Sequence, residues 1–286
     1  MMKTIVITGA TSGIGLETAK ALAREGFRVL GVGRSGERCE KAKETILSQA
    51  ENADVTFFTA DLMQQREVLR VAEQINADLA QHGGELHALI HNAGCVRSWY
   101  MTTDEGYEQQ FALNYLSAFL LTQKLFPPLR RAKGRVILTG SGSHKHTRVR
   151  WNDVMLTRRY NPLLAYKQSK LCGMLFARGI NDRLADTGVR AYVVDPGLVN
   201  TEIGCKETGG LVRLVWKMRK GHGVSPAVPA RTFVWLCEPR NRPEGLYYDQ
   251  QRQKPYSGQV TTANADRLWA LSERLCNVQF GKETGE

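Results

Sequence analysis

The sequence contains no pair of cysteines at metal-binding or redox spacing. No two of its six cysteines form a Cys-x-x-Cys motif, which excludes a zinc knuckle and a dithiol redox site as interpretations. Isolated thiols are typical of a reducing compartment, so we expect free cysteines and no metal. The cysteines are Cys39, Cys95, Cys172, Cys205, Cys237 and Cys276.

Long hydrophobic runs are also absent. No apolar segment reaches the length that a helix needs to cross a bilayer, which argues against an integral membrane protein. The first predicted strand, residues 3–7, begins too early to leave room for a signal peptide, and we expect a cytoplasmic protein. The net charge of +11 leaves three interpretations open: solubility, attraction of anionic ligands, and peripheral contact with an anionic membrane surface.

Nucleic-acid-binding motifs and interdomain linkers are missing too. Basic residues are spread along the chain, and we interpret the densest cluster, within residues 145–159, as solvated loop charge rather than a nucleic-acid site. No Pro/Gly/Ser-rich stretch and no repeat divides the chain. With 42% hydrophobic residues, 286 residues can bury one large core, so we predict a single domain over residues 1–286.

Predicted strands and helices alternate in the first half of the chain, a pattern typical of a parallel sheet with helical crossovers. We predict an α/β protein with a single-domain Rossmann fold, a doubly wound parallel sheet flanked by helices. Pro127 and Pro128 are expected to end a long helix that begins near Tyr107. Strands are expected at residues 5–7, 28–32, 55–58, 86–91, 135–138 and 190–194, and helices at 16–24, 40–49, 67–80, 107–126, 163–185, 226–236 and 263–275.

A glycine-rich turn lies between the first predicted strand and the first predicted helix. Its spacing is Gly-x-x-x-Gly-x-Gly rather than the commoner Gly-x-Gly-x-x-Gly. Glycines at this place let the backbone approach a pyrophosphate at a helix N-terminus. We therefore predict a dinucleotide site at Gly9, Thr11, Ser12, Gly13, Ile14 and Gly15.

The end of the second predicted strand distinguishes between two cofactors. Sites that bind NAD usually place an acidic residue there, which bonds the ribose 2′-hydroxyl. This chain has no acid in the stretch 31–35 and carries Arg34 and Ser35 instead. A guanidinium group suits phosphate oxygens, so we predict that NADP(H) is preferred over NAD(H).

Tyr166 and Lys170 are four residues apart, so on a helix they lie on one face, one turn from each other. A free tyrosine titrates near pH ~10 and is a poor proton donor or acceptor at neutral pH. A nearby ammonium favours the phenolate and lowers that pKa. The spacing alone leaves two interpretations open: a tyrosine adapted for general acid–base catalysis, and a half-buried tyrosine that merely neighbours a solvated lysine.

These motifs, taken in order, resemble the short-chain dehydrogenase/reductase family over nearly the whole chain. The nearest likeness is to the group that contains the retinol dehydrogenases and the WW-domain oxidoreductases, as judged from Arg34, the long gap between Ser141 and Tyr166, and the segments 165–171 and 268–272. The further residues that carry the resemblance and its cofactor site are Asp61, Leu62, Asn92, Ala93, Gly94, Asn114, Pro196, Gly197, Val199 and Thr201.

The resemblance implies hydride transfer between NADP(H) and an alcohol or carbonyl compound. In the family's arrangement Tyr166 is the general acid or base, and Ser141 donates a hydrogen bond to the substrate oxygen. Lys170 binds the nicotinamide ribose, and Asn114 holds a water that links Lys170 to solvent. Ser143 is a second candidate for the catalytic hydroxyl, and we favour Ser141 because it directly follows the fifth predicted strand.

The segment of residues 202–224 combines apolar side chains with a basic rim. Three interpretations stay open: a lid over a lipophilic substrate, a helix that only packs on the domain, and a contact with a membrane surface. Two histidines, His144 and His146, follow Ser141, but a Ser–His hydrolase needs a longer glycine motif and a following helix, which are missing.

Two further functional classes compete with the enzyme. One is a protein that senses NADP(H) without turnover, and the other is an interaction protein with vestigial catalysis. The presence of Ser141, Tyr166 and Lys170 together disfavours both. The resemblance also implies a homodimer or homotetramer formed through the helices that carry Asn114 and the Tyr/Lys pair.

Overall fold

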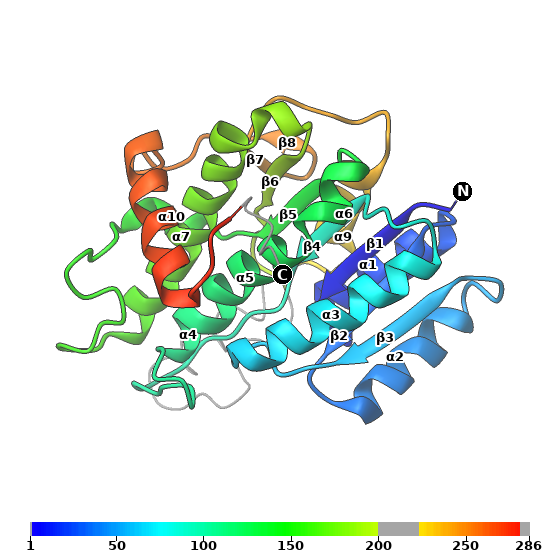
Figure 1. The fold of residues 1–286 in the computed structure, drawn as a ribbon, viewed down its shortest axis with the longest axis horizontal. Helices are drawn as coiled ribbons and strands as arrows, with labels where there is room; N and C mark the ends of the chain where they lie inside the picture. Colours follow the sequence, from blue (N-terminus) through cyan, green and yellow to red (C-terminus); the bar gives the residue numbers. More distant parts are fainter. Residues whose placement is uncertain (1, 200–222, 281–286) are drawn as a thin grey trace.

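One mixed sheet crosses the molecule in the strand order β3-β2-β1-β4-β5-β6-β7-β8 (Figure 1). The computed structural model describes residues 2–199 and 223–280, and within them β1 to β7 run parallel while β8 is antiparallel to β7. The predicted doubly wound parallel sheet is therefore confirmed. The strands are β1 (Thr4–Thr8), β2 (Arg28–Gly33), β3 (Val55–Thr59), β4 (Ala88–His91), β5 (Arg135–Thr139), β6 (Arg190–Val194), β7 (Tyr247–Asp249) and β8 (Arg252–Gln253).

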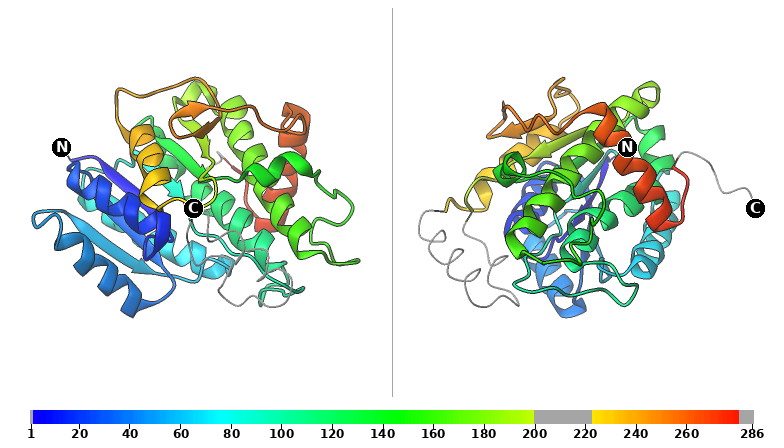
Figure 2. Two further views of the ribbon diagram at one scale, coloured as in Figure 1. Left: turned by 180° about the vertical axis from the view of Figure 1, so that it is seen from behind. Right: turned by 90° about the vertical axis from the view of Figure 1, so that its left-hand side faces the viewer.

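Helices cover both faces of the sheet. Helices α3, α5 and α7 lie in front of it in Figure 1, and α1, α2 and α9 lie in front when it is seen from behind (Figure 2). Each layer has its own apolar cluster, so every residue of β1, β2 and β4 is buried. The helices are α1 (Gly13–Arg24), α2 (Gly36–Leu47), α3 (Gln65–Gln81), α5 (Ser117–Lys124), α7 (Pro162–Arg183), α9 (Ala227–Cys237) and α10 (Thr262–Cys276).

The long helix predicted over residues 107–126 is broken into shorter pieces. Helix α4 (Gln109–Phe111) passes into a π-helix, η1 (Ala112–Leu116), before α5 begins. Pro127 and Pro128 do not end a helix; they stand in the first turn of α6 (Phe126–Arg131). Backbone N–H groups in the first turn of a helix have no partner within the helix, so proline, which lacks this group, is tolerated there. The two prolines therefore mark the start of a helix, whereas the prediction made them the end of one.

Strands β7 and β8 were not predicted from the sequence. They have three and two residues, too few to show a period. Strand β7 exists because Tyr247 and Tyr248 pair with Val193 and Val194 of β6. Such pairing depends on residues more than fifty positions away, which a local pattern does not contain.

The order of the strands reverses between β1 and β4. From β1 the chain proceeds to β2 and β3 on one side, and then crosses back to β4 on the other. The carboxyl ends of β1 and β4 diverge into loops there, and this is where open α/β sheets bind ligands.

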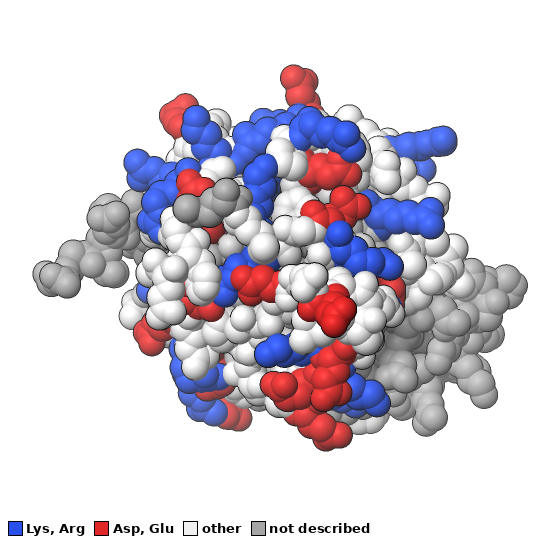
Figure 3. Space-filling model, turned by 90° about the vertical axis from the view of Figure 1, so that its right-hand side faces the viewer, with Lys and Arg blue, Asp and Glu red and all other residues white. Residues whose placement is uncertain are grey.

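The surface carries both signs of charge. Figure 3 shows Lys and Arg side chains interspersed with Asp and Glu over the face in view. In the two described stretches of the chain, no helix is both long enough and apolar enough to cross a membrane.

Candidate active site

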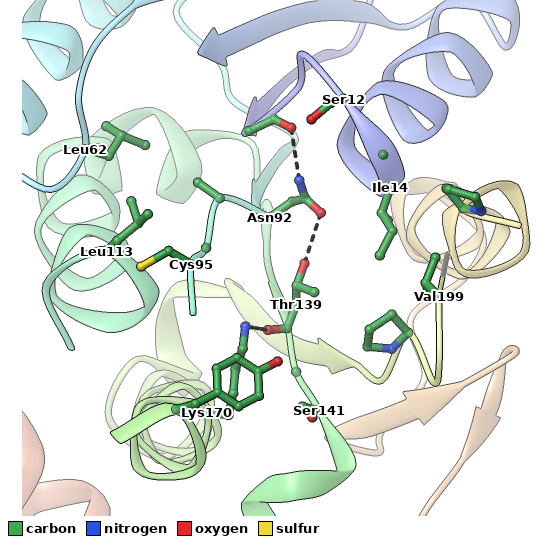
Figure 4. Close-up of a pocket in the computed structure, with 18 of the residues that line it drawn as sticks. Ser12, Ile14, Leu62, Asn92, Cys95, Leu113, Thr139, Ser141, Lys170 and Val199 are labelled. Carbon is green, nitrogen blue, oxygen red and sulfur yellow. Dashed lines mark hydrogen bonds between the residues drawn. The ribbon is translucent and has the colours of Figure 1, made fainter. Parts of the chain in front are cut away.

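A cavity of about 1390 Å³ opens at the carboxyl ends of β1, β2, β4, β5 and β6 (Figure 4). Most of the residues predicted for the site line it: Gly9, Thr11, Ser12, Gly13, Ile14, Arg34, Ser35, Asp61, Leu62, Asn92, Ala93, Gly94, Ser141, Tyr166, Lys170, Pro196, Gly197 and Val199. Gly15 and Asn114 do not line it. Thr201 lies outside the described residues, as does the segment predicted as a lid except for its last two residues.

The glycine turn provides a backbone surface without side chains. Gly9 and Gly13 have φ values of +67° and +57°, which favour glycine. A Cβ atom on Gly15 would lie 2.3 Å from the carbonyl oxygen of Gly9, so Gly15 is needed for close packing of α1 on the turn. Helix α1 begins at Gly13 and directs its unpaired N–H groups to this side. This cradle fits the pyrophosphate of a dinucleotide.

A basic patch borders the same cavity at the start of α2. Ser35 caps this helix, and its Oγ accepts a hydrogen bond of 3.4 Å from the backbone N–H of Arg38. Arg34 and Arg38 both line the cavity. Arg38 was not predicted from the sequence, because it lies in the first turn of α2 while Arg34 precedes the cap of that helix. Two guanidinium groups and a helix N-terminus suit a phosphate at this position.

Asn92 joins the ends of three neighbouring strands. Its Nδ2 donates to the carbonyl oxygens of Gly9 at 3.1 Å and Thr8 at 3.3 Å, and its Oδ1 accepts from Thr139 Oγ1 at 3.5 Å. The Thr8 hydroxyl also accepts from the backbone N–H groups of Asn92 and Ala93. Figure 4 shows this path from the glycine turn through Asn92 to Thr139. The motif 92–94 therefore holds the floor of the cavity together.

Lys170 is buried beneath the cavity and points at the end of β5. Its Nζ donates to the carbonyl oxygen of Thr139 at 2.8 Å (Figure 4), and it lies 5.7 Å from the centroid of the Tyr166 ring. Burial lowers the pKa of the Lys170 ammonium to about 8. At neutral pH the group is therefore still mostly charged, beside a phenol in the same cavity wall.

Two serines follow β5, and both line the cavity. Ser141 caps the N-terminus of the 3₁₀ helix η2 (Gly142–His146), and its Oγ accepts from the Ser143 N–H at 3.3 Å. The hydroxyl oxygen of Ser143 is buried and has no hydrogen-bond partner among the described residues. Assignment of the reactive hydroxyl to Ser141 stays a prediction.

Asn114 ties the loop after β4 to helix α7. Its Oδ1 accepts from the Cys95 N–H at 2.8 Å, and its Nδ2 donates to the Cys95 carbonyl at 3.0 Å and to Ser169 Oγ at 2.9 Å. Ser169 in turn donates to the carbonyl oxygen of Tyr166. A small cavity of about 10 Å³ lies beside Asn114 and Lys170, a size that admits one water. The predicted water link through Asn114 stays a prediction.

The loop after β6 is shaped by the strand that the sequence did not predict. Asp195 Oδ1 accepts from the Gly197 N–H at 3.0 Å, and Asp195 Oδ2 accepts from the Tyr247 hydroxyl. Gly197 has φ +66° and turns the chain back toward the cavity. Strand β7 thus positions Pro196 and Gly197.

His144 is a structural residue. It is fully buried, its Nε2 accepts from the Ser257 N–H at 3.3 Å, and its Nδ1 lies 2.7 Å from the Ser141 carbonyl oxygen. These partners require a neutral ring with the proton on Nδ1, in agreement with the pKa of His144 being lowered by burial. His144 therefore does not face a serine hydroxyl as a base, which agrees with the rejection of a hydrolase.

Further residues line the cavity that the sequence did not single out. Apolar side chains and one buried arginine stand out among them: Met63, Cys95, Arg97, Leu113, Leu163, Leu198 and Pro226. No local signal distinguishes these residues, because their place in the cavity wall depends on the packing of distant segments. Among the described residues, no group of three or more His, Cys, Asp or Glu side chains could hold a metal ion.

Residues 3–209 match the family described as short chain dehydrogenase. The chain is 35% identical over 282 residues to retinol dehydrogenase 12 of Mus musculus, covering 97% of this chain and 87% of that protein. It is 33% identical over 296 residues to the WW domain-containing oxidoreductase of Gallus gallus, covering 99% of this chain and 70% of that protein.

A solved structure of an uncharacterized protein from Mycobacterium paratuberculosis is also similar. It superposes with a TM-score of 0.75 at 27% sequence identity, covering 98% of this chain and 95% of that one. The similarity in fold therefore extends over the sheet and both helical layers.

Proposed function

This chain belongs to the short-chain dehydrogenase/reductase family, and from that membership we propose that it transfers a hydride between NADP(H) and a lipophilic alcohol or carbonyl compound. It is an oxidoreductase that acts on CH–OH or C=O groups and takes a nicotinamide cofactor. One observation carries the finer proposal. The buried Lys170 ammonium lies 5.7 Å from the Tyr166 ring, in the wall of a cavity that Ser141 also lines.

Tyr166 moves the proton in the proposed reaction. It donates a proton to the oxygen of a carbonyl compound, or removes one from the hydroxyl of an alcohol. The ammonium of Lys170 favours the ionised phenol and so makes this exchange accessible near neutral pH. Ser141 donates a hydrogen bond to the same substrate oxygen and stabilises the charge that develops on it. When bound, the nicotinamide supplies or accepts the hydride.

The preference for NADP(H) is proposed from the basic patch at the start of α2. Arg34, Ser35 and Arg38 line the cavity at the end of β2, where an acid would be needed for the 2′-hydroxyl of NAD. A 2′-phosphate there would meet two guanidinium groups, the Ser35 hydroxyl and the N-terminus of a helix.

A lipophilic substrate is proposed from the apolar part of the cavity wall. Leu163, Leu198, Val199 and Pro226 line the cavity together with the catalytic candidates. Leu198 is 46% exposed, so part of its apolar surface is accessible to a ligand. A relative of this chain is named a retinol dehydrogenase, and a retinoid is one member of the proposed substrate class.

The proposal is tested by incubating the full chain with NADPH or NADH and a panel of aldehydes, ketones and retinal. Loss of absorbance of the reduced nicotinamide is expected with at least one lipophilic carbonyl compound, faster with NADPH. The Tyr166→Phe variant serves as the control and should bind NADPH while its turnover falls by about a hundredfold or more. Binding of NADPH without oxidation across the whole panel would instead identify a cofactor sensor.

A further inference from the structure

Helix α10 lies along the layer formed by α5 and α7. Its buried residues recur at intervals of one, three or four positions and so form one apolar stripe. Figure 1 shows α10 beside α7, with the chain beyond it turning back toward α5. The residues of the stripe are Ala265, Leu268, Trp269, Ser272 and Cys276.

Trp269 forms the centre of this contact and is only 3% exposed. Its ring packs edge-on against Phe119 of α5 at 5.5 Å and lies 5.8 Å from Phe176 of α7, as measured between ring centroids. A Cβ atom on Gly179 would lie 3.0 Å from the indole, so the ring rests directly on the backbone of α7. The glycine thus permits a close approach of α10 to the helix that carries Tyr166.

Phe280 completes the contact after the helix has ended. Its ring lies 4.7 Å from Trp269, 5.8 Å from Phe119 and 5.3 Å from Phe126. Glu273 Oε1 accepts hydrogen bonds from the Phe280 N–H at 2.9 Å and from the Trp269 indole N–H at 3.3 Å. Glu273 therefore holds the returning chain against the aromatic cluster.

Polar contacts surround and support this apolar centre. The hydroxyls of Tyr115 and Ser272, both fully buried, are 2.5 Å apart. At the rim, Arg183 pairs with Asp266 at 2.7 Å. Interfaces between subunits typically have an apolar, aromatic centre and a polar rim. The contact of α10 and Phe280 with α5 and α7 has the same composition, but it forms within one chain.

The outward side of α10 has a different character. Exposed positions on it are Ala263, Arg267, Ala270 and Arg274. Among the described residues, none of the exposed large hydrophobic side chains lies on α5, α7 or α10. A twofold contact across this side would offer little apolar surface and would bring arginines of two copies together.

We propose that α10 and Phe280 take the place of a second copy of the chain on the α5/α7 face, so that the protein does not self-associate through these helices. This inference replaces the expectation of a dimer or tetramer built on the helices of Asn114 and the Tyr/Lys pair. It is independent of the proposed reaction, because it concerns only the packing of the C-terminal segment.

Sedimentation velocity combined with hydrogen exchange tests the proposal on the full chain. The expected result is a particle of 32.0 kDa whose α10 amides exchange slowly over about a hundredfold range of protein concentration. Two results would overturn the proposal. One is a larger assembly that dissociates when Ala270, on the outward side of α10, is replaced in the Ala270→Glu variant. The other is a larger assembly in which the α10 amides exchange rapidly. A larger assembly with protected α10 amides that Ala270→Glu leaves intact uses another face and agrees with the proposal.

Substitution of the cap gives a second, positive test. The Phe280→Ala variant removes the ring that covers Phe119 and Phe126. The Gln279→Ala variant changes the exposed neighbouring residue and is the matched control. The Phe280→Ala protein is expected to bind an apolar dye more strongly and to form dimers as its concentration rises. Folded Phe280→Ala protein that stays monomeric and binds no more dye than the control would show that the cap does not prevent pairing.

Discussion

Replacement of Lys170 by methionine should stabilise the folded protein at neutral pH while it removes catalysis. Lys170 Nζ is buried, and its one hydrogen bond to another described residue goes to the Thr139 carbonyl oxygen at 2.8 Å. Methionine has a similar length and no charge to desolvate, so it suits the same space. A gain in stability together with a loss of catalysis would show that Lys170 serves the reaction and not the stability of the fold.

The magnitude follows from the depressed pKa. Burial lowers the pKa of Lys170 from 10.5 to about 8, so the folded protein binds this proton less tightly than the unfolded chain. The charged group therefore costs about 3 kcal/mol of folding free energy below pH 8, and this cost fades between about pH 8 and pH 10.5. Loss of the hydrogen bond to Thr139 costs about 1–2 kcal/mol. The variant should gain about 1–2 kcal/mol at pH 6.5.

Urea unfolding of the wild type and Lys170→Met at pH 6.5 and pH 10 measures this difference. The variant is expected to be the more stable protein at pH 6.5 and the less stable one at pH 10, where the wild-type amine is largely neutral. Lys167→Met, on the same helix but at a partly exposed position, is the control and should show no such crossover. A stability difference that is the same at both pH values, or a variant destabilised at pH 6.5, would refute the reasoning.

Three further predictions concern the cofactor site and the packing. Tyr166→Phe should lower turnover by about 10²–10⁴-fold, since a general acid–base group is lost, while fluorescence titration finds the Kd for NADPH changed by no more than about threefold; substantial remaining activity would contradict the role of the phenol. Arg34→Ala should weaken NADPH binding by about 10–100-fold through loss of a charge-assisted hydrogen bond and leave NADH binding almost unchanged; equal losses for both cofactors would disprove the phosphate contact. Ser272→Ala should reduce the free energy of unfolding, measured by urea titration, by about 1–2 kcal/mol, because the buried hydroxyl of Tyr115 loses its partner. If Ser272→Ala destabilised the Tyr115→Phe protein as much as it destabilises the wild type, the lost hydrogen bond would not be the cause.

The central strands could be predicted because their information is local. Each of β1, β2 and β4 is a short apolar run that ends at a glycine or a polar residue, and each is buried on both sides. Strands β7 and β8 lack such a run and are formed by pairing with distant partners. The π-helix within the segment 107–126 also escaped prediction, because apolar periodicity does not distinguish one long helix from consecutive shorter ones.

The candidate site was predictable where its residues act through spacing. The separation of Tyr166 and Lys170 places them on one helix face, and the glycine turn must follow the first strand. The partners of these residues were not predictable. That Lys170 bonds Thr139, and that Asn114 clamps Cys95 to α7, follows from the crossing of segments far apart in the chain.

The sequence by itself determined the family, the order of the strands and helices in the first half, and half of the residues that line the cavity. These features depend on residue type and short spacing, which are properties of the chain before it folds. Only the tertiary structure decided the burial that lowers the pKa of Lys170, the neutral structural role of His144, and the packing of Trp269 and Phe280 on the α5/α7 face. Burial and hydrogen bonding depend on which distant side chains meet, and that is settled only when the sheet and its helices have packed together.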